Sequence, residues 1–225
     1  MSFYLIITIT LYPYFKIYAQ VIIIQATFEN WESEYTGFCL TMNPGMAGLS
    51  LFIPFLPLLP KQILLTNLLT DFPEMTIATD NVDEEMINYP QRWDIKAIRK
   101  FMITFGLVSS VFDYLTFGLL LLVLRVNETG FRTGWFLESV ISASVIVLVI
   151  RSRKPFFRSK PGKYLLIATL SIAFITLILP FTPLGTIFGL SPLSLITYLL
   201  LMLIVVLYIF AAEITKTIFY KKVKF

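Results

Sequence analysis

Long apolar runs separated by short connections dominate the chain from residue 101 to its end. A helix that crosses a bilayer needs roughly 20 mostly apolar residues. Four runs approach or exceed that length, so we expect four consecutive membrane-spanning helices. Their ranges are Phe101–Leu124, Trp135–Ile150, Tyr164–Leu179 and Ser191–Ala212.

The apolar stretch before these runs, Leu51–Ala78, is interrupted by prolines. They stand at Pro54, Pro57, Pro60 and Pro73. Because proline lacks an N–H and its ring clashes with the preceding turn, helices bend or stop there. The stretch therefore predicts a turn followed by one broken helix.

The first 45 residues follow a different pattern. Phe3–Ala26 is apolar enough to be a span, but Pro13 and Lys16 interrupt it, and the residues that follow show no periodicity. We interpret residues 1–45 as an unassigned N-terminal segment that holds at most one poorly fitting membrane span.

Composition supports a membrane protein. Of the 225 residues, 57% are hydrophobic and 14% are charged, whereas soluble domains carry about 25% charged residues. We therefore expect an all-α integral membrane protein, a bundle of about five to six transmembrane helices. With no His, the chain lacks imidazole catalysis and imidazole metal sites, and its one cysteine, Cys39, cannot form an intrachain disulfide. We expect no catalytic residues.

The positions of the basic residues predict the topology. Most Lys and Arg lie in Asp80–Lys100, Arg151–Lys163 and Lys216–Phe225, which alternate with the connections Asn127–Gly134 and Pro180–Ser191. These two connections hold one basic residue between them, Arg132. Basic connections face the cytoplasm, so we expect a multi-pass protein of the plasma membrane with a cytoplasmic C-terminus. No segment combines a basic face with interleaved aromatic residues, so we expect the lipid bilayer, and no nucleic acid, as a partner.

Candidate chemistry lies in the segment from residue 61 to residue 78. Four oxygen-bearing side chains share one face of the predicted helix because they follow the spacing i, i+3, i+4 and i+7: Asn67, Thr70, Asp71 and Glu74. Such ligands select hard cations such as Mg²⁺ or Ca²⁺ over transition metals. We expect a cation site here, with Asn67 and Asp71 as its strongest members.

Two features sharpen this expectation. Asp71 lies ~16 Å along the helix from Pro60, about the middle of a ~30 Å hydrocarbon core, where a carboxylate is costly. Pro73 cannot donate to the carbonyl of Leu69, so that oxygen is left free for a cation. The alternative is that Asp71 and Glu74 form only the cytoplasmic end of a short helix that Pro73 stops.

Three other acidic residues lie in predicted spans. Asp113, near the middle of Phe101–Leu124, is a secondary candidate for the cation site, but pairing with another helix is the favoured interpretation. Glu138 and Glu213 stand near the predicted helix ends, where their side chains can reach the membrane interface.

Four linked segments together carry a family likeness: Ile53–Ile87, Pro90–Phe117, Thr133-Gly134-Trp135-Phe136 and Pro180–Gly185. They resemble magnesium-translocating P-type ATPases, and the likeness covers Met46–Phe225. The resemblance implies that residues 46–225 are the C-terminal membrane domain, with Leu64–Ala78 as the sixth helix and the four later spans as helices seven to ten.

The same resemblance implies roles for individual residues. Asn67-Leu68-Leu69-Thr70-Asp71 matches the NLxxD cation motif, whose Asn, Thr and Asp positions bind the ion in the related calcium pumps. The transported ion would be Mg²⁺, imported at the expense of ATP. The remaining partners would be the other domains of the pump or an intact homologous pump.

The motifs for phosphorylation (DKTGT), dephosphorylation (TGES) and the hinge (GDGxND) are absent from the sequence. We therefore expect a truncated or frame-disrupted fragment of a translocase that cannot hydrolyse ATP alone and uses ATP only through domains that it lacks. The alternative is a non-catalytic remnant or an accessory membrane protein without transport activity of its own.

Overall fold

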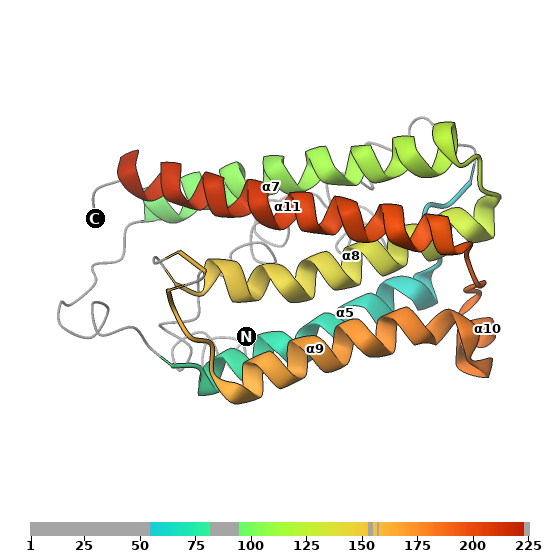
Figure 1. The fold of residues 1–225 in the computed structure, drawn as a ribbon, viewed down its shortest axis with the longest axis horizontal. Coiled ribbons are helices and arrows are strands. Elements are labelled where there is room, and N and C mark those ends of the chain that lie inside the picture. Colours follow the sequence, from blue (N-terminus) through green and yellow to red (C-terminus); the bar gives the residue numbers. More distant parts are fainter. Residues whose placement is uncertain (1–54, 82–94, 153–154, 157, 223–225) are drawn as a thin grey trace, which may run out of the picture.

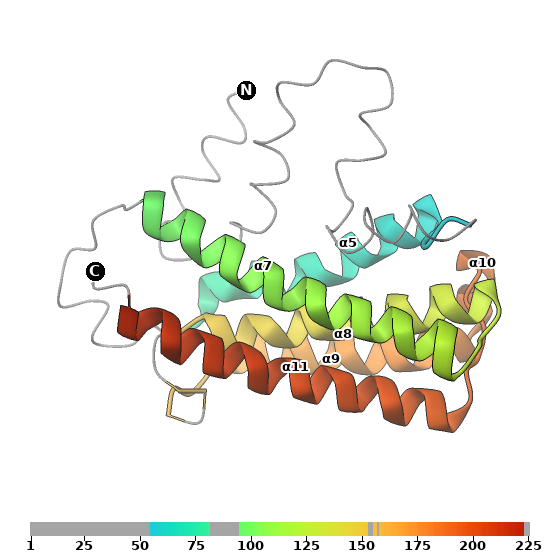
Figure 2. The same cartoon turned by 90° about the horizontal axis from the view of Figure 1, so that it is seen from above.

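The computed structural model of the chain describes residues 55–81, 95–152, 155–156 and 158–222. Over these ranges the fold is a bundle of helices without strands. Long helices run side by side along the long axis and are joined at the two ends of the bundle (Figure 1, Figure 2). They are α5 (Pro60–Thr76), α7 (Ile95–Gly118), α8 (Glu128–Ile150), α9 (Lys163–Ile178) and α11 (Leu195–Lys222).

Short helical pieces extend or connect these helices. The 3₁₀ turn η1 (Ile77–Thr79) follows α5, and the π-helical turn η2 (Leu119–Val123) continues α7. Between α9 and α11 lie the 3₁₀ turn η3 (Leu179–Phe181) and the six-residue helix α10 (Pro183–Phe188). Pro180 and Pro183 stand at the starts of these two pieces, so the chain turns where the sequence predicts that the third span ends.

Four helical stretches of the described chain are long and apolar enough to cross a membrane. They are Ile103–Val123, Glu128–Ile150, Lys163–Phe181 and Leu195–Lys221. They overlap the four predicted spans, which confirms an all-α membrane bundle. The predicted span within residues 1–45 lies outside the described residues, and the division of the chain at residue 46 stays a prediction.

The helix expected to be broken is continuous. α5 has 17 residues, keeps Pro73 inside it and passes directly into η1. Together α5 and η1 are about 30 Å long, enough to cross the hydrocarbon core. Proline therefore removes one hydrogen bond from the helix without ending it, and the expected break is wrong.

The start of α8 also differs from the expectation. The helix begins at Glu128, well before Trp135, because Asn127 caps it: the Asn127 side chain accepts a hydrogen bond of 2.8 Å from the Gly130 N–H. Such a cap satisfies one of the free amides in the first turn. The first turns of α8 contain few apolar residues, so hydropathy alone predicts a connection there.

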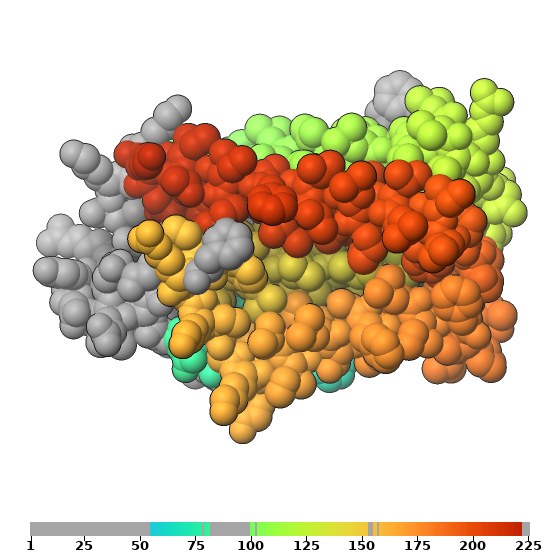
Figure 3. All heavy atoms as spheres, viewed as in Figure 1, coloured from blue at the N-terminus to red at the C-terminus, as the bar shows by residue number. Residues whose placement is uncertain are grey.

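α8 is the central helix of the bundle. It packs against α5, α7, α9 and α11, and 83% of its span is buried inside the protein, against 22–33% of the other three spans. Figure 3 shows the same arrangement from outside, with α8 visible between α11 and α9. A helix enclosed in this way is buried on every side, so its polar residues face other helices instead of lipid.

The helices alternate in direction as the topology predicts. At one end of the bundle, Asp80, just after η1, pairs with Arg151 and accepts a hydrogen bond from the Gly162 N–H. At the other end, the Gln62 amide donates to the Gly189 carbonyl. The basic connection between α8 and α9 therefore lies at the same end as the C-terminal end of α5.

Candidate functional site

One face of α5 is left open by the other described helices. α5 packs against α8 and α9, while the opposite face exposes Asn67 and Asp71. These two lie one helical turn apart, so an amide and a carboxylate stand next to each other. They are surrounded by exposed apolar side chains: Leu64 (70% exposed), Leu68 (54%), Phe72 (54%) and Met75 (69%).

The other two predicted ligands lie at the border of this open face. Thr70 and Glu74 are half-buried. The Thr70 hydroxyl donates to the carbonyl oxygens of Thr66 (3.1 Å) and Asn67 (3.2 Å), within its own helix. Its oxygen can still accept, but the exposed polar side chains of the open face are Asn67 and Asp71, with Glu74 at its border.

Pro73 lies on the buried side of the helix. Because it has no N–H, the carbonyl of Leu69 lacks its usual helical donor. Leu69 is itself buried in the core, at 9% exposure. α5 therefore presents side-chain oxygens on its open face, and one turn before Pro73 the Leu69 carbonyl has no helical hydrogen-bond donor.

α5 does not form a complete metal site by itself. Within the described ranges, no group of three or more His, Cys, Asp or Glu side chains is placed to hold a metal ion. A hard cation prefers about six oxygen ligands, some of which are waters in the case of Mg²⁺. The α5 residues can therefore supply only part of a coordination shell.

Asp113 lies apart from this set, in the interface of α7 and α8. It is 7% exposed, and its Oδ1 accepts a hydrogen bond of 3.3 Å from Nε1 of Trp135. α5 and α7 both pack on α8 but share no extensive contact with each other. The structure thus brings the four α5 residues together and gives Asp113 a partner on α8.

Glu138 was missed as a candidate by sequence reasoning. It stands in the middle of α8 and is 3% exposed, not near a helix end. Its Oε2 has no hydrogen-bond partner among the described residues. Ser142 and Asp113 lie close enough to interact with it. The signal that would have placed it correctly is the cap at Asn127, which sets the start of the helix.

These buried acids lie inside the bundle, where apolar side chains form two cores. One core gathers around Phe117, Phe131 and Trp135, and the other around Phe105, Val147 and other residues nearer the opposite end of α8. Carboxyl groups at such depth are found where membrane proteins carry ions or protons. The described chain therefore has two acidic positions at membrane depth, on the open face of α5 and between α7 and α8.

Comparison with known sequences identifies the family that this chain matches. The family described as "Cation transporting ATPase, C-terminus" matches residues 55–218. This range contains every described helix except the last residues of α11.

Individual relatives carry magnesium in their names. A protein of Salmonella typhimurium (strain LT2) named "Magnesium-transporting ATPase, P-type 1" is 40% identical over 172 residues, covering 74% of this chain and 19% of the relative. The Escherichia coli (strain K12) protein of the same name is 42% identical over 151 residues, covering 65% of this chain and 17% of the relative. The chain thus spans about a fifth of the length of the curated relatives that it matches.

Proposed function

Since the chain belongs to the cation-transporting ATPases, whose C-terminal region it matches, we propose that it forms part of the membrane pathway of an ATP-driven Mg²⁺ importer. In this proposal α5 is the sixth helix of the pump, and α7, α8, α9 and α11 are helices seven to ten. The open face of α5 is one wall of the cation pathway.

The observation that carries the proposal is a carboxylate on an apolar helix face. Asp71 is exposed among Leu68, Phe72 and Met75, near the middle of the helix. If this face met lipid, the charge would cost about 2.5–3.5 kcal/mol. Asn67, one turn from Asp71, would then face lipid as well. The open face is therefore better explained as one wall of a polar pathway that other helices complete.

The ligand chemistry favours Mg²⁺ as the transported ion. Asn67 and Asp71 supply one amide oxygen and one carboxylate, with Thr70 and Glu74 beside them. Mg²⁺ retains several waters and is usually bound by one or two carboxylates, whereas Ca²⁺ takes more protein oxygens. The relatives with which this chain aligns bear magnesium in their names.

The proposal also includes the energy source of transport and the orientation of the helices in the membrane. The sequence contains no DKTGT motif, so ATP-driven phosphorylation acts from another part of the pump. The basic segments at the ends of α8 and α11 face the cytoplasm of a cell whose plasma membrane the helices cross. The partners are then lipid, Mg²⁺ and the phosphorylated domains.

A chimeric pump tests the role of Asp71. Residues 55–218 replace the matching segment of the E. coli relative, and Mg²⁺ uptake is measured in cells that lack their own Mg²⁺ transporters. We expect Asp71→Asn to lower uptake about 10- to 100-fold, since a contact with a charged group is worth about 1.5–3 kcal/mol. Glu128→Gln is the matched control, because it removes a 59% exposed carboxylate on a different helix, at the first residue of α8.

The outcomes separate the proposal from its alternative. Equal uptake by the chimera and its Asp71→Asn variant would remove Asp71 from the mechanism. A chimera that reaches the membrane but transports nothing, with or without substitutions, would favour an accessory or non-catalytic role for this region.

A further inference from the structure

We propose that Gln62 and Asp80 are positioning residues that clamp the two ends of α5 to the rest of the bundle. This role rests on the proposed function, because it concerns what holds the cation-binding face of α5 in place. Neither residue lies on that face, and neither is a predicted ligand. Each joins the helix to a connection that is distant in sequence.

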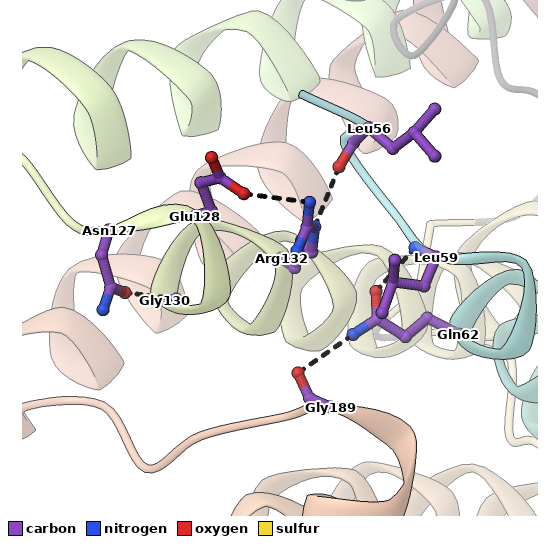
Figure 4. A network of polar contacts seen from close by, with 8 residues as sticks. All are labelled: Leu56, Leu59, Gln62, Asn127, Glu128, Gly130, Arg132 and Gly189. Carbon is purple, nitrogen blue, oxygen red and sulfur yellow. Dashed lines mark hydrogen bonds and ion pairs between the residues drawn. The ribbon is translucent and has the colours of Figure 1, made fainter. Parts of the chain in front are cut away.

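The N-terminal clamp consists of Gln62, its neighbour Lys61, and Arg132 of α8. Gln62 is fully buried, and its Nε2 donates to the carbonyls of Phe188 (3.1 Å) and Gly189 (3.3 Å) between α10 and α11. Its Oε1 accepts from the Leu59 N–H at 2.9 Å, which caps the helix. Figure 4 shows Gln62 between Leu59 and Gly189.

Two cations strengthen this clamp. Lys61 donates through Nζ to the Ile187 carbonyl. Arg132 donates through Nε to the carbonyl of Leu56 at 2.9 Å, just before α5, and pairs with Glu128 on its own helix (Figure 4). The start of α5 is thus tied both to α8 and to the connection between α9 and α11.

The C-terminal clamp consists of Asp80, Arg151 and the backbone of Gly162. Asp80 Oδ2 lies 2.7 Å from Arg151 Nη1, and Oδ1 accepts from the Gly162 N–H at 2.6 Å. The side chains of Asp80 and Arg151 are only 7% and 4% exposed. Arg151 also donates through Nη2 to Ser159 at 2.8 Å, so the end of α5, the end of α8 and the start of α9 meet at one carboxylate.

These contacts suit a helix with one open side. Apolar packing is non-directional, so contact with α8 and α9 alone leaves α5 able to slide or rotate on them. Hydrogen bonds impose direction and distance, and both oxygens of the Asp80 carboxylate are held, one by Arg151 and the other by the Gly162 N–H. Clamps at both ends therefore fix the rotation of α5 and the direction in which Asn67 and Asp71 point.

Spin-label distances test this positioning in the full chain, reconstituted in lipid nanodiscs without Mg²⁺ or ATP. In a Cys39→Ser background, one label pair joins α5 to α9 (Leu68→Cys with Ile167→Cys), at sites that are 54% and 61% exposed. A second pair joins α9 to α11 (Ile167→Cys with Leu203→Cys) and reports on the bundle without α5.

Each clamp is then released by substitution. Gln62→Leu removes the donors to the α10–α11 connection, and Asp80→Ala removes the ion pair and the acceptor for Gly162. Asp80→Asn is a milder variant that keeps the acceptor. We expect the α5–α9 distances to shift and broaden, less for Asp80→Asn than for Asp80→Ala, while the α9–α11 distances stay as they are. Thr79→Ala, at the exposed neighbouring position, is expected to change neither distribution.

Two results would overturn the proposal. Unchanged α5–α9 distances in the variants would show that packing alone positions the helix. Equal broadening of both label pairs, in the mild variant too, would show that these residues stabilise the whole bundle. Because the measurement involves no transport, a failure of the Asp71 uptake test leaves its result unaffected, and the two proposals can fail separately.

Discussion

Acidic residues in this bundle differ mainly in the surroundings that the helices give them. Asp80 is paired with Arg151 and accepts a backbone N–H, so its charge is compensated. Asp113 accepts from the Trp135 indole in a buried interface. Asp71 is exposed on the open face of α5. Of these three carboxylates, only Asp71 is exposed and makes no hydrogen bond or ion pair with the described residues.

Substitution of Asp113 tests its structural pairing. Asp113→Leu leaves the buried Trp135 N–H without an acceptor, which typically costs about 1–3 kcal/mol, whereas Asp113→Asn keeps an acceptor. We therefore expect the leucine variant to melt at a clearly lower temperature in detergent than the asparagine variant, measured by the loss of helical circular dichroism. Equal melting temperatures would show that the indole contact contributes little.

At the scale of the element, Gly134 of α8 allows the end of α7 to approach α8 closely. A Cβ added at Gly134 would lie 2.8 Å from Cδ2 of Leu120, a fully buried side chain of η2. Glycine therefore sets how near the end of α7 approaches α8. The same region holds the edge-to-face contact of Phe117 and Trp135, with ring centroids 4.9 Å apart.

A pair of glycine substitutions tests this close approach. Gly134→Leu must displace Leu120, and overpacking of this kind costs typically about 1–3 kcal/mol or more. Gly106→Leu on α7 is the matched control, because nothing lies within 4 Å of its added Cβ. We expect a lower melting temperature for the first variant only. Similar melting temperatures for both would mean that Leu120 moves aside at little cost.

α5 offers a second prediction at this scale, concerning Pro73. Pro73→Ala restores the donor to the Leu69 carbonyl, and alanine is about 3 kcal/mol more favourable than proline inside a helix. We expect the variant to be more stable to heat but to transport less Mg²⁺ in the chimera, since the free carbonyl is lost. Undiminished uptake in the stabilised variant would exclude a role for that carbonyl in the pathway.

At the scale of the whole molecule, alternating helix directions divide the connections between two ends. The α8–α9 connection lies with the end of α5, and the α9–α11 connection with its start. The basic residues Arg151, Lys163 and Lys222 belong to the first of these ends. The end of the bundle that is rich in basic residues is therefore one of the two ends that the helix directions define.

Reporter fusions test the orientation of that molecule. We expect a fluorescent protein fused after Phe225 to fluoresce, as it does in the cytoplasm, and alkaline phosphatase at the same position to be inactive. The matched fusions after Gly189, at the opposite end of the bundle, should give the reverse result. An active phosphatase after Phe225 would invert the predicted topology.

Much of the fold could be predicted from the sequence because the bilayer imposes simple requirements. The length of the apolar runs predicts the spans, and the distribution of Lys and Arg predicts which connections share one side of the membrane. The same reasoning found Asn67 and Asp71, since helical spacing alone puts them on one face. It misjudged Pro73 and the start of α8, where local capping and neighbouring helices decide the outcome.

The sequence by itself therefore determined the all-α membrane class, the four later spans and the set of oxygen-bearing side chains that share one face of α5. Only the tertiary structure decided which helix is central, that Glu138 and Asp113 are both buried, and that Asn67 and Asp71 remain on an open face. The physical reason is that helical periodicity is a local property of the chain. Which face is covered depends on contacts such as those of Gln62 with Gly189 and Asp80 with Arg151, whose partners are far apart in sequence.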